Sequence, residues 1–382
     1  MLENMLYYRK KEVRAVGDML EYIRWRGDLR FADVPFGPVD ALIFSSLVYL
    51  RLEGIVPTNM KHPIPLHVAA EAFAALQDCD NRIRIKNDLS LLQAAAEAPR
   101  FRDVRLGFYR SKLLEQEQTQ FAAMAWALPD GTVFLSFRGT DNTLIGWKED
   151  FNMSFCDSIP AQREAAAYTA EFVSEWPVLL RLGGHSKGGN LAVYAGAKQD
   201  AGIQKRILSI FNLDGPGFTE SMLADPGYLH MIPKIHTYIP ESSVIGILLE
   251  HEEAYSVIKS RQVSILQHEP HSWEIMGGDF VHKEEMSLSM RFTDKTIKNW
   301  IRDMSREDRE LLVETLYELI SAGGAKEVVD LLHPKSILAS LKTLKNKPES
   351  QKLLAGEFME LIRAIRQTIG ENKSRIEKEE KQ

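Results

Sequence analysis

The pattern of apolar and polar positions divides the chain into three stretches. Residues 1–100 are mostly helical by pattern, and the apolar run Ala41–Leu50 is long enough for a buried helix. Between residues 101 and 285, short β-rich runs alternate with helical ones. From Met286 onward the pattern is helical again. We therefore expect a core at 101–285 with helical additions at 1–100 and 286–382.

The core begins with a predicted antiparallel segment. Leu106–Leu113 is extended by pattern, and Gln120–Leu128 meets Thr132–Phe137 across the turn Pro129-Asp130-Gly131. Thr132–Phe137 is apolar on both faces, which is typical of a central strand. This pattern predicts a hairpin that places a buried strand in the middle of a sheet.

Strands and helices alternate after the hairpin. Helices are predicted at Gln162–Trp176 and Asn190–Lys198. Strands are predicted at Val178–Leu182, Ile207–Leu213 and Ile235–Ile239, and a second hairpin at Ala254–Lys259 with Gln262–Gln267. Such alternation indicates an α/β fold with a mostly parallel sheet flanked by helices.

The C-terminal region carries two apolar stripes at helical spacing. Their members are Leu312, Leu316, Leu319 and Ile320 in the first, and Leu354, Phe358, Leu361, Ile365 and Ile369 in the second. Packing against the core is the ordinary interpretation of such stripes, and a surface for a protein partner is the alternative.

Composition narrows the functional classes. The chain has 382 residues and a net charge of −6, which argues against nucleic-acid binding. The cysteines Cys79 and Cys156 indicate no disulfide framework, so a cytoplasmic location is expected. No signal-peptide pattern begins the chain, and no apolar run approaches the ~20 residues that a transmembrane segment needs. Neither a metal cluster nor a cofactor motif is predicted.

One motif carries chemistry. Gly184-His185-Ser186-Lys187-Gly188 fits the pattern G-x-S-x-G, between a predicted strand and a predicted helix. In α/β-hydrolases this turn is sharp and strained, and it holds a nucleophilic serine above the sheet. We therefore expect Ser186 to be a nucleophile, with His185 packed beneath the turn.

A serine hydroxyl needs a base and an acid that orients the base. In this fold both follow the serine along the chain. His268 directly follows Gln262–Gln267 and is the preferred base, with His271 as its rival. Asp214 ends the strand after the motif helix and is the preferred acid. Glu241 ends the next strand and is the competing acid.

An oxyanion hole needs two donors. One is expected to be the backbone N–H of Lys187, and the other to come from Thr140, in the loop after Thr132–Phe137. Arg138 is interpreted as a buried anchor of that loop. The Lys187 side chain is expected to point to solvent or along its helix. The segment Asp141–Ser158 is a candidate lid.

The same residues resemble known families. Phe137-Arg138-Gly139-Thr140 and the turn at Ser186 resemble the class 3 lipase core, and the closer resemblance is to the bacterial Mbeg1-like family. The latter rests on YIRWRGDLRF (22–31), GHSKGGNLA (184–192), NLDGPGF (212–218), YIPESSVIGILL (238–249) and QHEPHSW (267–273), within about residues 15–330. The resemblance implies an α/β-hydrolase fold, a Ser186 nucleophile and a His268 base. Class 3 lipases carry Leu where this chain has Lys187, and an Asp in the region that here is Pro240-Glu241-Ser242-Ser243.

The preferred hypothesis is a serine hydrolase that cleaves carboxylic esters, either small esters or lipids, without a cofactor. The alternative is a catalytically inactive hydrolase-like protein used for binding or as a scaffold, because a fold does not guarantee its usual activity. In that case the C-terminal helices would be the surface for a protein partner.

Overall fold

The computed structural model describes residues 16–114, 119–140, 149, 152–153, 156–287 and 307. Its helices are α2 Met19–Arg26, α3 Pro38–Leu47, α4 Leu66–Ala74, α5 Lys86–Glu97, α7 Pro160–Glu175, α8 Lys187–Ala197, α9 Ala201–Arg206, α10 Glu220–Leu223 and α11 Pro226–Met231. Short 3₁₀ helices are η1 Cys79–Arg82, η2 Ile232–Lys234, η3 Ser264–His268 and η4 Pro270–Ser272.

The strands form two sheets. They are β1 Val16–Gly17, β2 Ile64–Pro65, β3 Arg105–Leu114, β4 Thr119–Ala127, β5 Val133–Phe137, β6 Leu180–His185, β7 Ile207–Leu213, β8 Ile235–Pro240, β9 Tyr255–Ile258, β10 Ile275–Met276 and β11 Asp279–Phe280. The main sheet runs β2 to β9 in chain order, and β1, β10 and β11 make a small second sheet.

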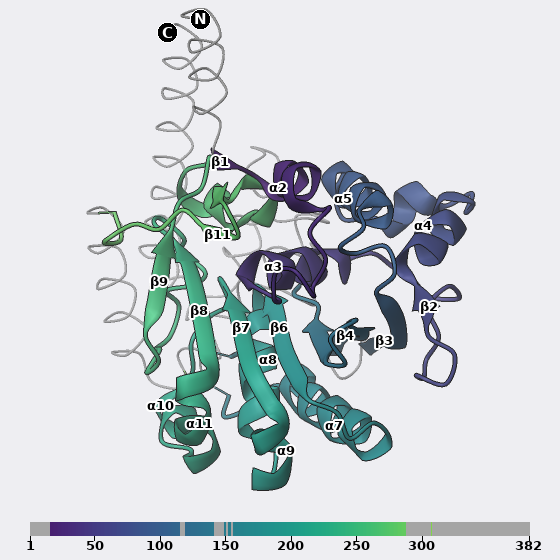
Figure 1. The fold of residues 1–382 in the computed structure, drawn as a ribbon. Helices are drawn as coiled ribbons and strands as arrows, with labels where there is room; N and C mark the ends of the chain where they lie inside the picture. Colours follow the sequence, from purple (N-terminus) through teal and green to yellow (C-terminus); the bar gives the residue numbers. More distant parts are fainter. Residues whose placement is uncertain are drawn as a thin grey trace, which may run out of the picture.

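The main sheet is antiparallel from β2 to β5 and parallel from β5 to β9. The predicted first hairpin is confirmed: β4 and β5 pair antiparallel around Gly131, whose φ is +80°. Helices cover the sheet, so the predicted α/β-hydrolase-like fold is confirmed (Figure 1).

The two faces of the sheet have different covers. The parallel strands β5 to β9 lie across the sheet in the same order as in the chain. Right-handed crossovers between such strands place all the connecting helices on one face of the sheet. Accordingly α7, α8 and α11 pack together, and α8 lies against β6 and β7. Side chains alternate along β5, so Val133 and Leu135 join that core while Phe134 joins the opposite one.

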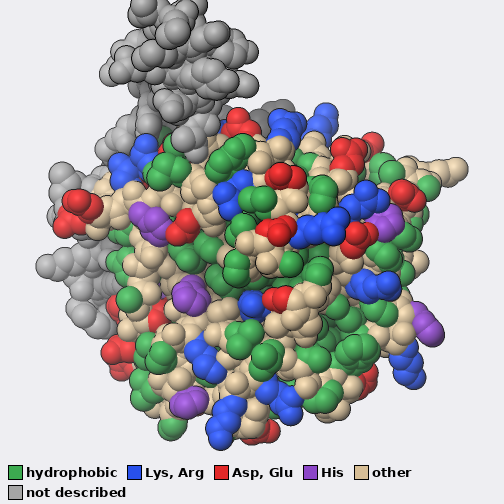
Figure 2. All heavy atoms as spheres, in the orientation of Figure 1, with side chains coloured by type: hydrophobic (Ala, Val, Ile, Leu, Met, Phe, Trp, Pro, Cys, Tyr) green, Lys and Arg blue, Asp and Glu red, His purple; other side chains and the backbone are tan. Residues whose placement is uncertain are grey.

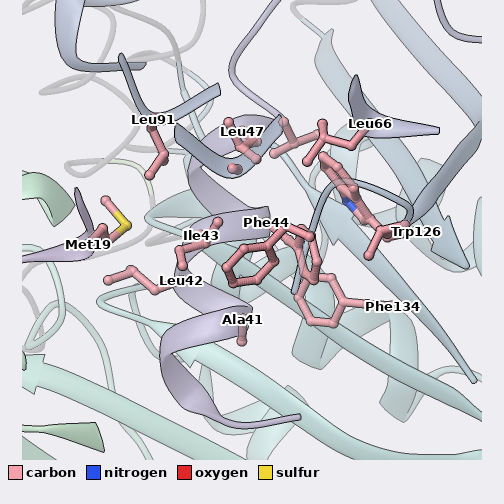
Figure 3. Close-up of a cluster of buried hydrophobic side chains, with 14 of the residues drawn as sticks. Met19, Ala41, Leu42, Ile43, Phe44, Leu47, Leu66, Leu91, Trp126 and Phe134 are labelled. Atoms are coloured by element: carbon pink, nitrogen blue, oxygen red, sulfur yellow. The ribbon is translucent and has the colours of Figure 1, made fainter. Parts of the chain in front are cut away.

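The N-terminal helices cover the face that the crossover helices leave open. Figure 1 shows α2 to α5 gathered on one side of the molecule and α9, α10 and α11 below the sheet. The buried helix predicted at Ala41–Leu50 is confirmed as α3, which lies across β5, β6 and β7. The Phe44 ring lies 4.7 Å from that of Trp126 and 5.9 Å from that of Phe134, centroid to centroid (Figure 3).

The predicted second hairpin is wrong. β9 pairs with β8 in parallel, with Tyr255 opposite Thr237, and the segment that follows contains the 3₁₀ helix η3 instead of a strand. Gln267 accepts two hydrogen bonds from residues that lie outside the strands. Its side-chain Oε1 accepts from the Ser242 N–H at 2.7 Å, and its backbone carbonyl accepts from Trp273 Nε1 at 2.9 Å. These bonds fold the segment across the sheet edge.

Several expectations concern residues outside the described part. Most of the candidate lid at Asp141–Ser158 and nearly all of the C-terminal region 286–382 with its stripes lie there. Among the helices of the described residues, none combines the length and the apolar character that a membrane crossing requires. The face in Figure 2 carries acidic and basic side chains interspersed among apolar ones.

Candidate active site

Ser186 stands at the turn between β6 and α8. Its φ of 61° and ψ of −137° lie in a region that non-glycine residues rarely adopt, which confirms the predicted strained turn. Glycine is required on both sides of it. A Cβ at Gly184 would lie 2.3 Å from the Gly188 carbonyl group, and a Cβ at Gly188 would lie 2.1 Å from the Phe137 carbonyl oxygen.

The backbone of Ser186 is bound to the turn that follows β7. Its N–H donates to the Leu213 carbonyl at 2.9 Å, and its side chain keeps 9% of its surface exposed. No described residue forms a hydrogen bond with the Ser186 hydroxyl. Catalytic hydrogen bonds are often long or misaligned in unliganded structures.

Asp214 directly follows β7 and lies beside this turn. It is fully buried, its φ is +55°, and its N–H donates to the Tyr238 carbonyl at 2.8 Å. Its Oδ2 accepts from His268 Nδ1 at 2.7 Å and from Ser243 Oγ at 2.7 Å. Burial raises the pKa of Asp214, and the hydrogen bonds from His268 and Ser243 oppose that rise only in part. An acid so held orients the imidazole and leaves its Nε2 for another partner.

His185 joins the serine turn to the segment that carries His268. Its Nε2 lies 2.7 Å from the His268 carbonyl oxygen, and the two rings lie 4.5 Å apart. Burial lowers the pKa of His185 well below its usual range, and the charges of His268 and Arg84 lower it further. The ring is therefore neutral. Because a carbonyl only accepts, the proton sits on Nε2, and Tyr49 lies 3.2 Å from Nδ1.

The rival residues have other partners. His271 Nε2 lies 2.9 Å from Asp88 Oδ1 on α5, and both side chains are buried. Glu241 lies 3.4 Å from Lys283 Nζ in a partly exposed ion pair. The structure therefore joins Asp214 to His268 next to the serine turn, and it engages His271 and Glu241 elsewhere.

The loop after β5 runs along the serine turn. A Cβ at Gly139 would lie 2.5 Å from the His185 carbonyl oxygen and 3.0 Å from Ser186 Cβ. Arg138 is buried, as predicted. Thr140, the expected second donor of an oxyanion hole, directly follows Gly139. Lys187, the other expected donor, is the first residue of α8.

The prediction for the Lys187 side chain is wrong. Its Nζ is fully buried and lies 2.7 Å from Glu149 Oε2 and 3.3 Å from the Gln120 carbonyl. Glu149 also accepts from the N–H groups of Gln120, at 3.3 Å, and of Ala161, at 3.1 Å. The ion pair thus links the start of α8 to β4 and α7. Sequence reasoning had no signal for it, because Glu149 lies in a segment without a clear pattern.

Lys187→Met is expected to lower the free energy of unfolding by about 3–5 kcal/mol, because it leaves the Glu149 carboxylate buried without its cation. Denaturant unfolding measures this loss. The double variant with Glu149→Gln removes both charges and should be more stable than Lys187→Met alone. A single variant within about 1 kcal/mol of the wild type would show that the pair is not buried as described.

Three further residues hold the site and were not predicted. Asn190 on α8 donates to the carbonyls of Pro216, at 3.1 Å, and Gly217, at 2.9 Å. Gln162 on α7 donates to Asn190 Oδ1 at 2.8 Å. These bonds fix the turn after Asp214 to the helix after Ser186. Ser243, the third, lies in the YIPESSV segment singled out for lacking an Asp, and its hydroxyl donates to Asp214.

Among the described residues, no group of three or more His, Cys, Asp or Glu side chains could hold a metal ion. The Asp214–His268 pair and the Ser186 turn beside it supply the types of group that nucleophilic attack by a hydroxyl requires.

Two solved structures and one family model are similar to this chain. The chain is similar in structure to the Rhizomucor miehei lipase propeptide complex, at 14% identity over 60% of this chain and 76% of that one, with a TM-score of 0.38. It is also similar to lipase II from Rhizopus niveus, at 18% identity over 47% of this chain and 72% of that one, with a TM-score of 0.32. No curated protein sequence matches it. The Mbeg1-like family model matches residues 95–318, which is more than half of the chain, and the chain therefore belongs to the Mbeg1-like family.

Proposed function

We propose that this protein is a serine hydrolase that cleaves carboxylic esters, in the manner of a lipase or esterase. The observation that carries the proposal is the 2.7 Å contact between His268 Nδ1 and the buried Asp214 carboxylate, beside a serine in a strained turn. Strained backbone and carboxylate–histidine pairs with a shifted pKa cluster at active sites, and here the two lie side by side.

In the proposed reaction, Ser186 Oγ attacks the ester carbonyl carbon while His268 Nε2 takes the hydroxyl proton. Asp214 stabilises the imidazolium that forms. The negative oxygen of the tetrahedral intermediate would accept from the backbone N–H groups of Lys187 and Thr140. The intermediate collapses, the ester C–O bond breaks, and the leaving alcohol takes the proton from His268.

A water molecule then completes the cycle. It gives a proton to His268 Nε2 and attacks the acyl carbon of the ester formed on Ser186. The carboxylic acid leaves, and Ser186 regains its proton from His268. Each donor lost from the oxyanion hole should cost about 2.7–4 kcal/mol of transition-state stabilisation.

The test is turnover of a panel of p-nitrophenyl esters with acyl chains from acetyl to palmitoyl. We expect saturable release of p-nitrophenol, with a kcat/KM that depends on acyl length. Heat-unfolded protein at the same concentration is the control for surface-catalysed hydrolysis. Release equal to this control for every ester would contradict the proposal and favour a role in binding.

A further inference from the structure

We propose that His251 and Glu253 form a buried hydrogen-bonded pair that positions Asp214, acting through the turn that holds Ser243 and Gly246. The inference rests on the proposed function, because it assigns Asp214 the role of triad acid. Both residues lie between β8 and β9, and their side chains are 3% and 1% exposed. They are therefore positioning residues that a substrate does not reach.

Glu253 is held by three donors from three parts of the fold. Its Oε1 accepts from Thr237 Oγ1 on β8 at 2.6 Å and lies 3.0 Å from His251 Nδ1. Its Oε2 accepts from the Tyr228 hydroxyl on α11 at 2.5 Å. Burial alone would raise the pKa of Glu253, but the hydrogen bonds and the charge of His251 outweigh it and lower the pKa to about 2. The carboxylate is therefore ionised and only accepts hydrogen bonds.

His251 faces acceptors with both ring nitrogens. Nδ1 faces the ionised carboxylate of Glu253, and Nε2 lies 2.8 Å from the Gly246 carbonyl oxygen. Both contacts are within hydrogen-bond distance, so the ring bridges the Glu253 carboxylate and the Gly246 carbonyl. The titratable groups around it are Glu253 on the same segment, Tyr228 on α11, Tyr255 on β9, Asp214 beyond Gly246, and the neighbouring Glu250 and Glu252.

Gly246 connects this pair to the triad acid. Its backbone lies so close to Asp214 that a Cβ there would be 2.2 Å from Asp214 Oδ1. Its N–H donates to Ser243 Oγ at 3.4 Å, and that hydroxyl in turn donates to Asp214 Oδ2 at 2.7 Å. Among the described residues, Asp214 Oδ1 has no hydrogen bond of ordinary geometry. The Gly246 N–H is nevertheless close enough to offset part of the rise in the Asp214 pKa that burial causes. The orientation of Asp214 therefore depends on where Gly246 is held.

Loss of the His251 ring would remove the contact to the Gly246 carbonyl. The turn is then free to move away from Asp214, and the carboxylate loses its fixed orientation toward His268. Displacement of a catalytic group by about 1 Å can cost roughly 100-fold in rate. Because neither residue touches the substrate, the loss should appear in kcat and not in KM.

His251→Gln is the main test in the full chain, since glutamine offers a single NH₂ group in place of the two ring nitrogens. We expect kcat for a p-nitrophenyl ester to fall about 10-fold, with KM within about twofold of the wild type. Glu253→Gln should also lower kcat with KM unchanged, because an amide holds the His251 ring less firmly than a carboxylate does. His236→Gln, on the exposed side of β8, is the matched control and should change neither kcat nor KM.

Backbone NMR of ¹⁵N-labelled protein separates this proposal from the proposed function. We expect His251→Gln to shift the amide signals of Gly246 and Asp214, whether or not the wild type hydrolyses esters. Unshifted amide signals, or an unchanged kcat in a folded His251→Gln, would overturn the inference. If His251→Gln does not fold, an unchanged kcat in Glu253→Gln overturns it instead. Absence of turnover in the wild type would count against the proposed function alone.

Discussion

Ser186→Ala is expected to lower ester turnover by roughly 10⁴-fold or more and to abolish labelling by a fluorophosphonate probe. The probe reacts with a serine only where a base activates its hydroxyl, and alanine offers no oxygen to attack or to be labelled. The fold should be retained, because the strain of the turn is borne by the backbone and the Ser186 N–H still donates to Leu213. Circular dichroism and thermal unfolding check this.

Ser45→Ala is the matched control for that experiment. Ser45 is a fully buried serine on α3 whose hydroxyl has no hydrogen-bond partner among the described residues. It should keep wild-type labelling and turnover. If Ser186→Ala were labelled as strongly as the wild type, the nucleophile would be another residue. If neither protein were labelled and neither hydrolysed an ester, the chain would have the fold without the activity.

The local parts of the site follow from the sequence because short-range patterns specify them. G-x-S-x-G between an apolar strand and a helix predicts the turn at Ser186, since the glycines are needed where backbones approach closely. The position of Asp214 after the next strand follows from the rule that parallel strands end at one sheet edge. The sequence left the acid open between Asp214 and Glu241, and the structure adds the contact from Asp214 to His268.

The missed parts depend on residues far apart in the chain. Lys187 and Glu149 are 38 positions apart, and nothing near either residue shows that the other will be buried with it. The second strand of the predicted hairpin, at Gln262–Gln267, does not form for a related reason. Its alternating pattern is compatible with a strand, but hydrogen bonds from Ser242 and Trp273 favour a different path. Tertiary contacts override local β propensity in such segments.

The sheet also explains why the N-terminal helices belong to the site. All crossover helices lie on one face, so α3 lies against the other, and α5 packs on α3. The α5 region brings charged groups to the segment that carries His268. Arg84, just before α5, binds Glu269 through two hydrogen bonds of 2.7 and 3.0 Å, and Asp88 on α5 binds His271. The residues that follow His268 are thereby held by the N-terminal region, and the His268 carbonyl is held by His185.

Asp214→Asn is expected to lower kcat by roughly 10⁴-fold while KM and the fold change little. The carboxylate accepts the Nδ1 proton of His268 and so leaves Nε2 unprotonated, ready to take the serine proton. An asparagine at this position can place its NH₂ group where Oδ2 lies, toward Nδ1, because the Ser243 hydroxyl that donates to Oδ2 can instead accept from the amide. The imidazole then carries its proton on Nε2, where it cannot act as a base.

Glu241→Gln is the matched control, because Glu241 is the other carboxylate that ends a neighbouring strand. Its ion pair with Lys283 is partly exposed, and removing it should leave kcat within a few-fold of the wild type. Steady-state kinetics on both variants decide between the two acids. A large loss in Glu241→Gln together with a small loss in Asp214→Asn would move the acid to Glu241. It would also mean that the 2.7 Å contact between Asp214 and His268 is structural, because a carboxylate that orients the base cannot be replaced by an amide without forcing the wrong tautomer.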